Sequence, residues 1–468
     1  MIGFTTDIKE ATALEQNQRG SFTGKLGFVL SAAGASVGLG NIWRFPYLAA
    51  KYGGGAFLLV YIILALTFGY TMIVAETAIG RSTQKSPVSA FIHYSNTPYA
   101  KAGGWINAIV PILICPYYSV IGGWVCKYLF AFLTTDMETI TSDTFFTDFI
   151  TSGTSTEIWF CIFVFLNLII IYMGVENGIE RVSSIMMPIL LVLAVVIGVY
   201  TITRPGAMDG VVYFLVPHIE NFSWMTVVSA MGQMFYSLSI AMGILITLGS
   251  YMKKEVSIEE STLQVEFFDT AIAILAGMMI IPAVFAFSGG DAQSLKAGPS
   301  LMFVTMPKIF ATMGFGRLIG ILFFTLVLFA ALTSSIALTE SAVSTLVDEF
   351  HWSRVKGTTV MAVVLIALGT LSCLGYGPLS FITILGMPFL DFFDFLTNSV
   401  MMPIAALAIC LLVTKCMGLK RLEQEVEVDG HPFRRKKIFN VMITYIAPIF
   451  VLIILLSSVA SAFGLISM

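Results

Sequence analysis

The feature that most constrains this chain is an interrupted stretch inside an apolar run near its N-terminus. Residues 34–46 read GASVGLGNIWRFP, within a run long enough to span a bilayer. Each of its three glycines weakens a helix by about 1 kcal/mol relative to alanine, and Pro46 cannot donate a backbone hydrogen bond. Lipid offers no partners for freed backbone groups or for Asn41 and Arg44, so the stretch must face protein or a water-filled cavity. This pattern is typical of the broken helices of secondary transporters.

Composition places the chain among integral membrane proteins. Hydrophobic residues make up 57% of its 468 residues, and charged residues make up only 11%. A net charge of −3 gives no reason to expect a nucleic-acid partner. The six cysteines lie in or beside apolar runs without CxxC spacing, which favours packing over a zinc site or a disulfide framework. No nucleophile–base set or transition-metal cluster emerges, so an enzyme is not expected.

Hydrophobic spans of about 20 residues recur along the sequence. Eleven can be counted, so the expected fold class is an all-α polytopic membrane protein with eleven transmembrane helices. An outer loop at 289–314 contains a short apolar piece, 301–312, that is expected to form a surface helix. The spans are centred in 25–49, 54–79, 104–133, 157–173, 180–202, 223–251, 263–288, 315–347, 358–374, 381–414 and 439–464.

The distribution of basic residues sets the expected orientation. With the N-terminus inside, eighteen of the 25 Lys and Arg residues lie on the inner side. The outer loop 134–156 has four acidic residues and no basic one. We therefore expect a cytoplasmic N-terminal segment (1–24) and a cytoplasmic loop (415–438). An odd number of spans then places the eleventh helix and the C-terminal segment (439–468) so that the chain ends outside the cell.

The chain divides into two halves with matching interruptions. The sixth span contains residues 232–243, GQMFYSLSIAMG, where glycines and hydroxyls again interrupt an apolar run. The first and sixth spans are corresponding members of two five-span units, 25–202 and 203–414, which is where inverted repeats place their broken helices. The alternative is two unrelated seams of small residues that let transmembrane helices pack closely.

Polar side chains inside the spans mark candidate binding groups. Asp269 falls near the start of the seventh span, where a carboxylate costs roughly 2.5–3.5 kcal/mol on insertion scales and needs a partner. It could instead be an interfacial acid that reaches the membrane surface. Thr333, Ser334 and Ser335 in the eighth span either bond back to the preceding turn or contribute hydroxyls to an oxygen cage for an alkali cation.

Taken together, these stretches resemble the neurotransmitter:sodium symporters, and especially their LeuT-like bacterial members. The resemblance runs from about Arg19 to Pro448. It implies a LeuT-like 5+5 inverted repeat with broken first and sixth helices, and sodium-coupled amino-acid import by alternating access. Its markers are residues 38–46 (GLGNIWRFP), residues 53–57 (GGGAF), Glu76 with Gly80 and Arg81, Gly232 with Gln233, and residues 330–335 (AALTSS).

The resemblance implies two sodium sites that are built only from oxygen ligands. In the first site, the carboxylate of the substrate would be a further ligand. The first site would comprise the carbonyl of Ser36 and the side chains of Asn41, Ser237 and Asp269. The second site would comprise the carbonyls of Gly34, Val37 and Ala330 and the hydroxyls of Thr333 and Ser334.

The resemblance also implies a substrate pocket beside the two breaks. The substrate carboxylate would meet the amides of Leu39 and Gly40, because amides freed at a helix break favour an anion, and the hydroxyl of Tyr118. Monoamine carriers of the family have an acid where this chain has Gly38, so an amino acid is expected. An uncharged pocket favours a neutral, large hydrophobic or aromatic one. The pocket would comprise Ser36, Leu39, Gly40, Ile114, Tyr118, Tyr236, Ser237, Ser239, Met242, Ser334 and Leu338.

The family pattern further implies two charged gates. Arg44 and Asp394 would close the outer side, and Arg19 and Asp348 would close the inner side. Beside the inner pair this chain has Phe22, where many relatives have tryptophan.

Other mobile parts follow from the same pattern. Tyr118 and Tyr236 would form an aromatic lid over the substrate. Gly178 and Pro188 match the spacing of a site at which the fifth helix unwinds toward the inside. Glu76 would bond the unwound backbone rather than a ligand.

Chloride is expected to play no part. Animal relatives bind chloride with groups that match Tyr61, Gln233 and Ser237 and with a serine of the seventh span. That last position is Ala273 here, and Asp269 already supplies a fixed negative charge beside the first sodium site.

The expected function is therefore sodium-coupled symport of an amino acid in a bacterial inner membrane, with two Na+ and no organic cofactor. The absence of a twelfth span and the cysteine-free outer loop favour the bacterial location. A sensor that binds an amino acid and a sodium-conducting channel on the same fold stay open as alternatives. Lipid surrounds the protein, and the sequence does not indicate an oligomeric state.

Overall fold

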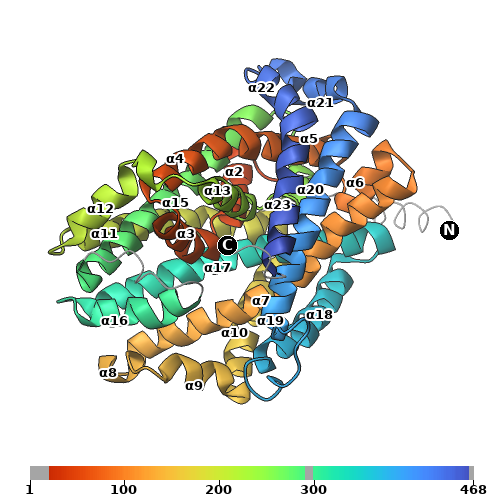
Figure 1. Ribbon diagram of the computed structural model, residues 1–468. Coiled ribbons are helices and arrows are strands. Elements are labelled where there is room, and N and C mark those ends of the chain that lie inside the picture. Colours follow the sequence, from red (N-terminus) through yellow and green to blue (C-terminus); the bar gives the residue numbers. More distant parts are fainter. Residues whose placement is uncertain (1–19, 290–298, 463–468) are drawn as a thin grey trace, which may run out of the picture.

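The computed structural model describes residues 20–289 and 299–462, which form a bundle of helices (Figure 1). In these residues, nine helices are long and apolar enough to cross a membrane, and a bent pair makes a tenth span. One more span is divided into two short helices, α13 (Trp224–Ser237) and α14 (Ile244–Gly249). The described part of the chain therefore contains the eleven spans that the sequence predicts.

The first half of the chain supplies five spans. A short helix, α6 (Pro87–Tyr94), joins the second span to the third, and α8 (Met137–Ile140) and α9 (Phe145–Thr151) follow the third. The spans comprise α2 (Lys25–Ser36) with α3 (Phe45–Lys51), α4 (Gly55–Leu64) with α5 (Tyr70–Thr83), α7 (Pro98–Thr134), α10 (Gly153–Tyr172), and α11 (Arg181–Ile202).

The second half supplies six spans and several short helices. The short helices are α12 (Ala207–Leu215), α16 (Met306–Ala311) and α21 (Leu419–Val426). The apolar piece at 301–312 is helical as expected, as the π-helical segment Leu301–Thr305 followed by α16, but most of its side chains are buried and not at the surface. After α13 and α14, the spans comprise α15 (Ile258–Ser288), α17 (Gly316–Phe350), α18 (Arg354–Leu374), α19 (Phe389–Asp394) with α20 (Met402–Leu411), and α22 (Lys436–Val441) with α23 (Ala447–Ala462).

The first span breaks where the sequence predicts. Helix α2 ends at Ser36, and Val37 has an extended backbone with ψ of 94°. Helical structure resumes at Gly40, and the two parts of the span are bent by 54° relative to each other. The glycine-rich stretch therefore interrupts the helix rather than forming a packing seam.

The sixth span breaks at the corresponding place in the second half. Helix α13 ends at Ser237, and α14 begins at Ile244. Between them Ser239 and Ala241 have positive φ angles of 54° and 59°. Such a conformation costs roughly 1–3 kcal/mol per non-glycine residue, so the surrounding structure must hold it. Glu76 on α5 does so, because its Oε1 accepts the amide hydrogen of Ala241 at 2.7 Å.

Burial separates the central helices from those at the periphery. The apolar windows of α7 and α17 are 83% and 72% buried, whereas those of α10 and of the span that includes α11 are only 33% buried. Helix α17 packs along α7, α2 and α11. The two breaks therefore face α7 and α17 within the protein, while α10 and α11 present exposed apolar side chains to the bilayer.

Two regions differ from the predicted spans. The tenth span begins at Phe389 rather than near 381, because the chain makes turns before it and Gly386 has a positive φ of 77°. The loop 415–438, which the sequence predicts to be cytoplasmic, is partly helical, since it contains α21. In Figure 1, α21 and α22 lie at the opposite end of the bundle from α8 and α9.

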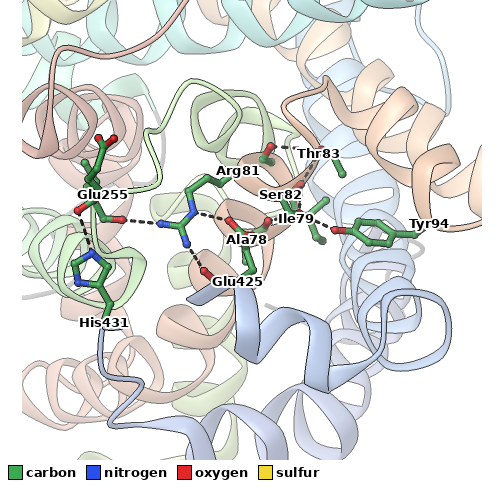
Figure 2. Close-up of polar contacts among 11 residues, drawn as sticks. Ala78, Ile79, Arg81, Ser82, Thr83, Tyr94, Glu255, Glu425 and His431 are labelled. Atoms are coloured by element: carbon green, nitrogen blue, oxygen red, sulfur yellow. Dashed lines mark hydrogen bonds and ion pairs between the residues drawn. The ribbon is translucent and has the colours of Figure 1, made fainter. Parts of the chain in front are cut away.

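A buried arginine joins the inner end of the second span to this loop (Figure 2). Arg81 of α5 is fully buried and donates from Nε to Glu425 Oε1 at 2.6 Å and from Nη1 to the carbonyl of Val256 at 2.6 Å. It also donates to the carbonyl of Glu425. Nearby, His431 Nε2 lies 3.0 Å from the carbonyl oxygen of Glu255. These contacts fix α21 against the connection between α14 and α15.

We expect Arg81→Gln to lower the free energy of unfolding by about 3–5 kcal/mol, because it leaves the Glu425 carboxylate without its cation in a largely buried site. The matched control is Lys25→Gln, which breaks the exposed Lys25–Glu260 pair and should cost about 1 kcal/mol or less. Reversible unfolding in mixed micelles measures the free energy of unfolding of both variants. Equal losses in the two variants would contradict this role of Arg81.

Candidate functional site

A small cavity lies where the two broken spans meet. Its walls come from both breaks, from α7 and from α17. The eleven residues that the sequence predicts for a substrate pocket all line it: Ser36, Leu39, Gly40, Ile114, Tyr118, Tyr236, Ser237, Ser239, Met242, Ser334 and Leu338.

The lining combines apolar side chains with backbone amides near a helix break. Ile114, Met242 and Leu338 supply apolar surface, and the described lining residues include no charged side chain. The amide of Leu39 donates to the hydroxyl of Tyr118 at 3.2 Å. The cavity therefore suits a small molecule with an anionic group near the amides and an apolar remainder.

Gly38 and Gly40 leave the space that this cavity needs. A Cβ on Gly38 would lie 2.8 Å from the hydroxyl oxygen of Ser334 and 3.0 Å from that of Tyr118. A Cβ on Gly40 would lie 2.7 Å from the ring of Tyr236. An acidic side chain at position 38 would thus have to displace groups that form the cavity wall.

Asp269 lies at the centre of a buried hydrogen-bonded cluster. Its carboxylate accepts from Asn41 Nδ2 at 2.8 Å, from Ser237 Oγ at 2.9 and 3.0 Å, and from the hydroxyl of Tyr61 at 3.0 Å. All four side chains are buried. The cluster therefore joins α15 to the ends of both breaks, and Asp269 is not an interfacial acid.

The atoms of this cluster suit a small, hard cation. Asp269 supplies a carboxylate and Ser237 a hydroxyl oxygen, while the amide oxygen of Asn41 accepts the amide hydrogen of Gly38 at 3.2 Å. The hydroxyl of Ser36, where α2 ends, is buried without a hydrogen-bond partner. Such oxygens favour alkali and alkaline-earth ions over softer metals. Across 20–289 and 299–462, no group of three or more His, Cys, Asp or Glu is placed to hold a metal.

A second oxygen cluster forms where α2 contacts α17. The hydroxyl of Ser334 lies 3.3 Å from the carbonyl oxygen of Gly34 and 3.3 Å from that of Val37. The hydroxyl of Thr333 bonds back to the carbonyl of Ala330 at 3.2 Å. Thr333 thus bonds to its own preceding turn, whereas Ser334 reaches across to the first span. All five residues predicted for the second sodium site lie together.

An outer cavity of about 310 Å³ lies beside the first one. Both residues of the predicted outer gate, Arg44 and Asp394, line it. Among the described residues, neither forms an ion pair within 4.0 Å. Asp394 instead accepts from the hydroxyl of Tyr117 at 3.2 Å and from Asn398 Nδ2 at 2.6 Å. The two charges that would close this side are therefore apart.

Leu39 and Tyr236 separate the two cavities, because both residues line each of them. The guanidinium carbon of Arg44 lies 5.4 Å from the centroid of the Tyr236 ring, a cation–π contact. The aromatic ring predicted as a lid thus lies between the inner cavity and the outer one.

The predicted inner gate is only partly described. Arg19 lies outside the described residues. Asp348 is described, and one of its carboxylate oxygens accepts the amide hydrogen of Ser86 at 2.7 Å. The Arg19–Asp348 pair therefore stays a prediction.

A set of packed side chains lies near the predicted inner gate. Phe22 is buried and its ring lies 6.0 Å from that of Phe28 and 6.1 Å from that of Tyr251. The hydroxyl of Tyr251 donates to Glu340 at 2.6 Å, and Arg354 pairs with the same carboxylate at 2.6 Å. The sequence analysis missed this pair, although an acid inside the eighth apolar span is the signal that could have found it.

The fifth helix is wound at the predicted site of unwinding. Gly178 lies in a π-helical segment, Val175–Glu180, and Pro188 lies inside α11. Glu180 accepts the amide hydrogen of Thr23 at 2.9 Å and is also bonded to its hydroxyl. The start of the first span is thus attached to the fifth span beside Gly178.

The groups that match the chloride site of animal relatives contact other parts of the protein. Tyr61 donates to Asp269, and Gln233 Nε2 donates to the carbonyl of Gly40 at 3.0 Å. Ala273 is fully buried and offers no hydroxyl. The carboxylate of Asp269 therefore supplies negative charge close to where those relatives bind the anion.

Comparison with known proteins agrees with this geometry. The chain is 32% identical to a sodium-dependent transporter of Bacillus subtilis over 92% of this chain and 96% of that protein. It is 28% identical to the human sodium- and chloride-dependent GABA transporter 2, over 88% of this chain and 75% of that protein. The crystal structure of MhsT in complex with L-phenylalanine is similar, with a TM-score of 0.85 and 35% identity, and the match covers 94% of this chain and 100% of that one.

The model of the sodium:neurotransmitter symporter family matches residues 19–149 and 147–465, nearly the whole sequence. The match includes both broken spans and all the oxygen clusters described above. This membrane-spanning chain therefore belongs to the sodium:neurotransmitter symporter family, a family of transporters and not of enzymes.

Proposed function

We propose that this protein imports a neutral, large hydrophobic or aromatic L-amino acid by alternating access, driven by two sodium ions and without chloride. The observation that carries the proposal is the cavity at the two breaks, whose described lining has backbone amides, an apolar wall and no charged side chain. The similar structure of MhsT holds L-phenylalanine, which is the kind of ligand that such a cavity suits.

The substrate would lie with its carboxylate against the amides of Leu39 and Gly40 and the hydroxyl of Tyr118, because amides at a helix break attract an anion. Its side chain would extend along the apolar wall that includes Ile114 and Met242. Met242 is flexible, so the wall can adapt to side chains of different shape.

The two oxygen clusters would hold the sodium ions. The first ion would be bound by the carbonyl of Ser36 and the side chains of Asn41, Ser237 and Asp269, with the substrate carboxylate completing the site. This shared ligand would couple substrate binding to sodium binding. The second ion would be bound by the carbonyls of Gly34, Val37 and Ala330 and the hydroxyls of Thr333 and Ser334.

The described conformation would be the outward-facing one. Arg44 and Asp394 are apart on the outer side, whereas Phe22 is buried on the inner side. Closure would bring Arg44 toward Asp394 above Tyr236. Opening of the inner side would then release Phe22 and unwind the fifth helix at Gly178.

Two sodium ions supply enough free energy for steep accumulation. Each ion that enters across about 100 mV contributes about 2.3 kcal/mol, and a tenfold gradient adds about 1.4 kcal/mol. Two ions therefore give about 7 kcal/mol for one zwitterion, which corresponds to roughly 10⁵-fold accumulation. We place the protein in a bacterial inner membrane because its outer loop 134–156 lacks cysteine, and the distribution of basic residues supports an N-terminus inside and a C-terminus outside.

Competition for uptake tests the substrate class. In proteoliposomes with an inward sodium gradient, Trp, Phe, Tyr and Leu should inhibit uptake of labelled leucine at least tenfold more strongly than Gly, Lys or Glu. Burial of the charged side chain of Lys or Glu in this cavity is costly, and Gly has no side chain to bury against the apolar wall. A preference for glycine or a cationic amino acid would contradict the proposal. Binding without uptake would indicate a sensor, and sodium current without substrate would indicate a channel.

We expect Asp269→Asn to raise the sodium concentration for half-maximal leucine binding by about tenfold or more, equivalent to about 1.4 kcal/mol, because it removes the formal charge of the cluster. The matched control is Asp429→Asn, at an exposed cytoplasmic position whose positive φ of 60° asparagine tolerates. A scintillation proximity assay of leucine binding measures the sodium dependence of both variants. Unchanged sodium dependence in Asp269→Asn would remove this residue from the site.

Replacement of chloride by gluconate should leave sodium-driven uptake unchanged within about twofold, because Asp269 carries the charge that a chloride ion would otherwise supply. The measurement is initial uptake of labelled leucine at constant sodium. A severalfold loss of rate in gluconate would show that the protein uses chloride.

A further inference from the structure

A second outer cavity, of about 210 Å³, lies between α3, α13 and α23. It shares Arg44, Tyr47 and Leu48 with the outer cavity described above, but its other residues differ. Lys51 contributes from α3 and Ser458 from α23. None of the roles proposed for the transport cycle uses this cavity.

Two cations face it from the same side of one helix. Arg44, Tyr47, Leu48 and Lys51 recur at spacings of three, four and seven residues, which places them on one helical face. The ammonium of Lys51 lies 5.7 Å from the ring centroid of Tyr47 and 5.0 Å from that of Tyr52. Each cation thus lies over tyrosine rings, Arg44 over Tyr236 and Lys51 over Tyr47 and Tyr52.

Negative side chains are absent from the described lining of this cavity. Within residues 20–289 and 299–462, neither Arg44 nor Lys51 pairs with a carboxylate within 4.0 Å. The neighbouring outer cavity, by contrast, includes Asp391 and Asp394. The lining of this cavity therefore carries two positive charges and, among the described residues, no negative one, which favours an anion.

The cavity also offers hydrogen-bond donors and free space. Tyr52 and Ser458 supply hydroxyls. A Cβ on Gly232, at the α13 wall, would meet no heavy atom within 4 Å, so this wall is open. A tetrahedral oxyanion has the size and the acceptors for such a lining, and a charge of −2 matches the two cations.

We propose that this second outer cavity binds a divalent oxyanion of the sulfate or phosphate class from the outer solution. The bound anion holds the guanidinium of Arg44 at this second outer cavity, away from Asp394. This consequence for gating rests on the proposed function, because it treats Arg44 and Asp394 as the outer gate. The binding site itself does not depend on transport.

Direct binding of ³⁵S-labelled sulfate to the purified protein tests the site. Scintillation proximity should show saturable binding to the natural protein, at least tenfold weaker binding to Lys51→Gln, and unchanged binding to Lys127→Gln. Lys127 is the matched control because it lies on α7 near Phe145 and Trp159, away from this cavity. Unsaturable binding to the natural protein, or equal loss in both variants, would overturn the proposal. Leucine binding checks that each variant is folded.

The effect on transport is measured separately. External sulfate in proteoliposomes should lower the maximal rate of leucine uptake severalfold in the natural protein, leave leucine affinity unchanged, and have no effect on Lys51→Gln. If sulfate binds but does not slow uptake, the proposed effect on the outer gate is overturned, whereas the binding site is not. If the protein proves not to transport, the binding assay still shows whether this cavity binds sulfate.

A lipid headgroup carries the same phosphate chemistry, so the membrane is varied as well. Sulfate affinity should be equal in vesicles of phosphatidylcholine alone and in vesicles that contain phosphatidylglycerol. Loss of sulfate binding in the anionic vesicles would assign the cavity to a lipid and overturn a free oxyanion as its ligand.

Discussion

The site depends on one constraint: backbone groups that two broken helices release inside the bilayer must find partners within the protein. Neighbouring spans supply some of those partners, so these backbone groups do not need water as a hydrogen-bond partner. The remaining amides and carbonyls face the central cavity and the two oxygen clusters. The supporting side chains are Glu76 on the amide of Ala241, Tyr118 on that of Leu39, Gln233 on the carbonyl of Gly40, and Ser239 on that of Ala35.

The two ends of the molecule differ in how their charged groups are satisfied. On the inner side, Glu340 is fully buried and bonded by both Tyr251 and Arg354, so this end is fixed. On the outer side, Arg44 rests on the Tyr236 ring and faces two cavities. A transporter that alternates between two states needs such an asymmetry, because its two sides must not be open at the same time. Arg44 is the group whose partner would change.

Local chemistry in the sequence predicts much of this architecture. Three glycines and Pro46 predict the first break, and the helix ends at Ser36 as expected. Other features depend on distant contacts. The Arg81–Glu425 pair joins residues 344 positions apart, so no local pattern indicates it. The late start of the tenth span at Phe389 depends on turn geometry at Gly386 that hydropathy does not reveal.

The central claim is that the two breaks together form the binding site. A structure determined with sodium and L-phenylalanine bound tests it most directly. The account requires the ligand carboxylate to contact the amides of Leu39 and Gly40, with a sodium ion between it and Asp269. Ligand density found only in the outer cavity, with no ion at Asp269, would contradict the account.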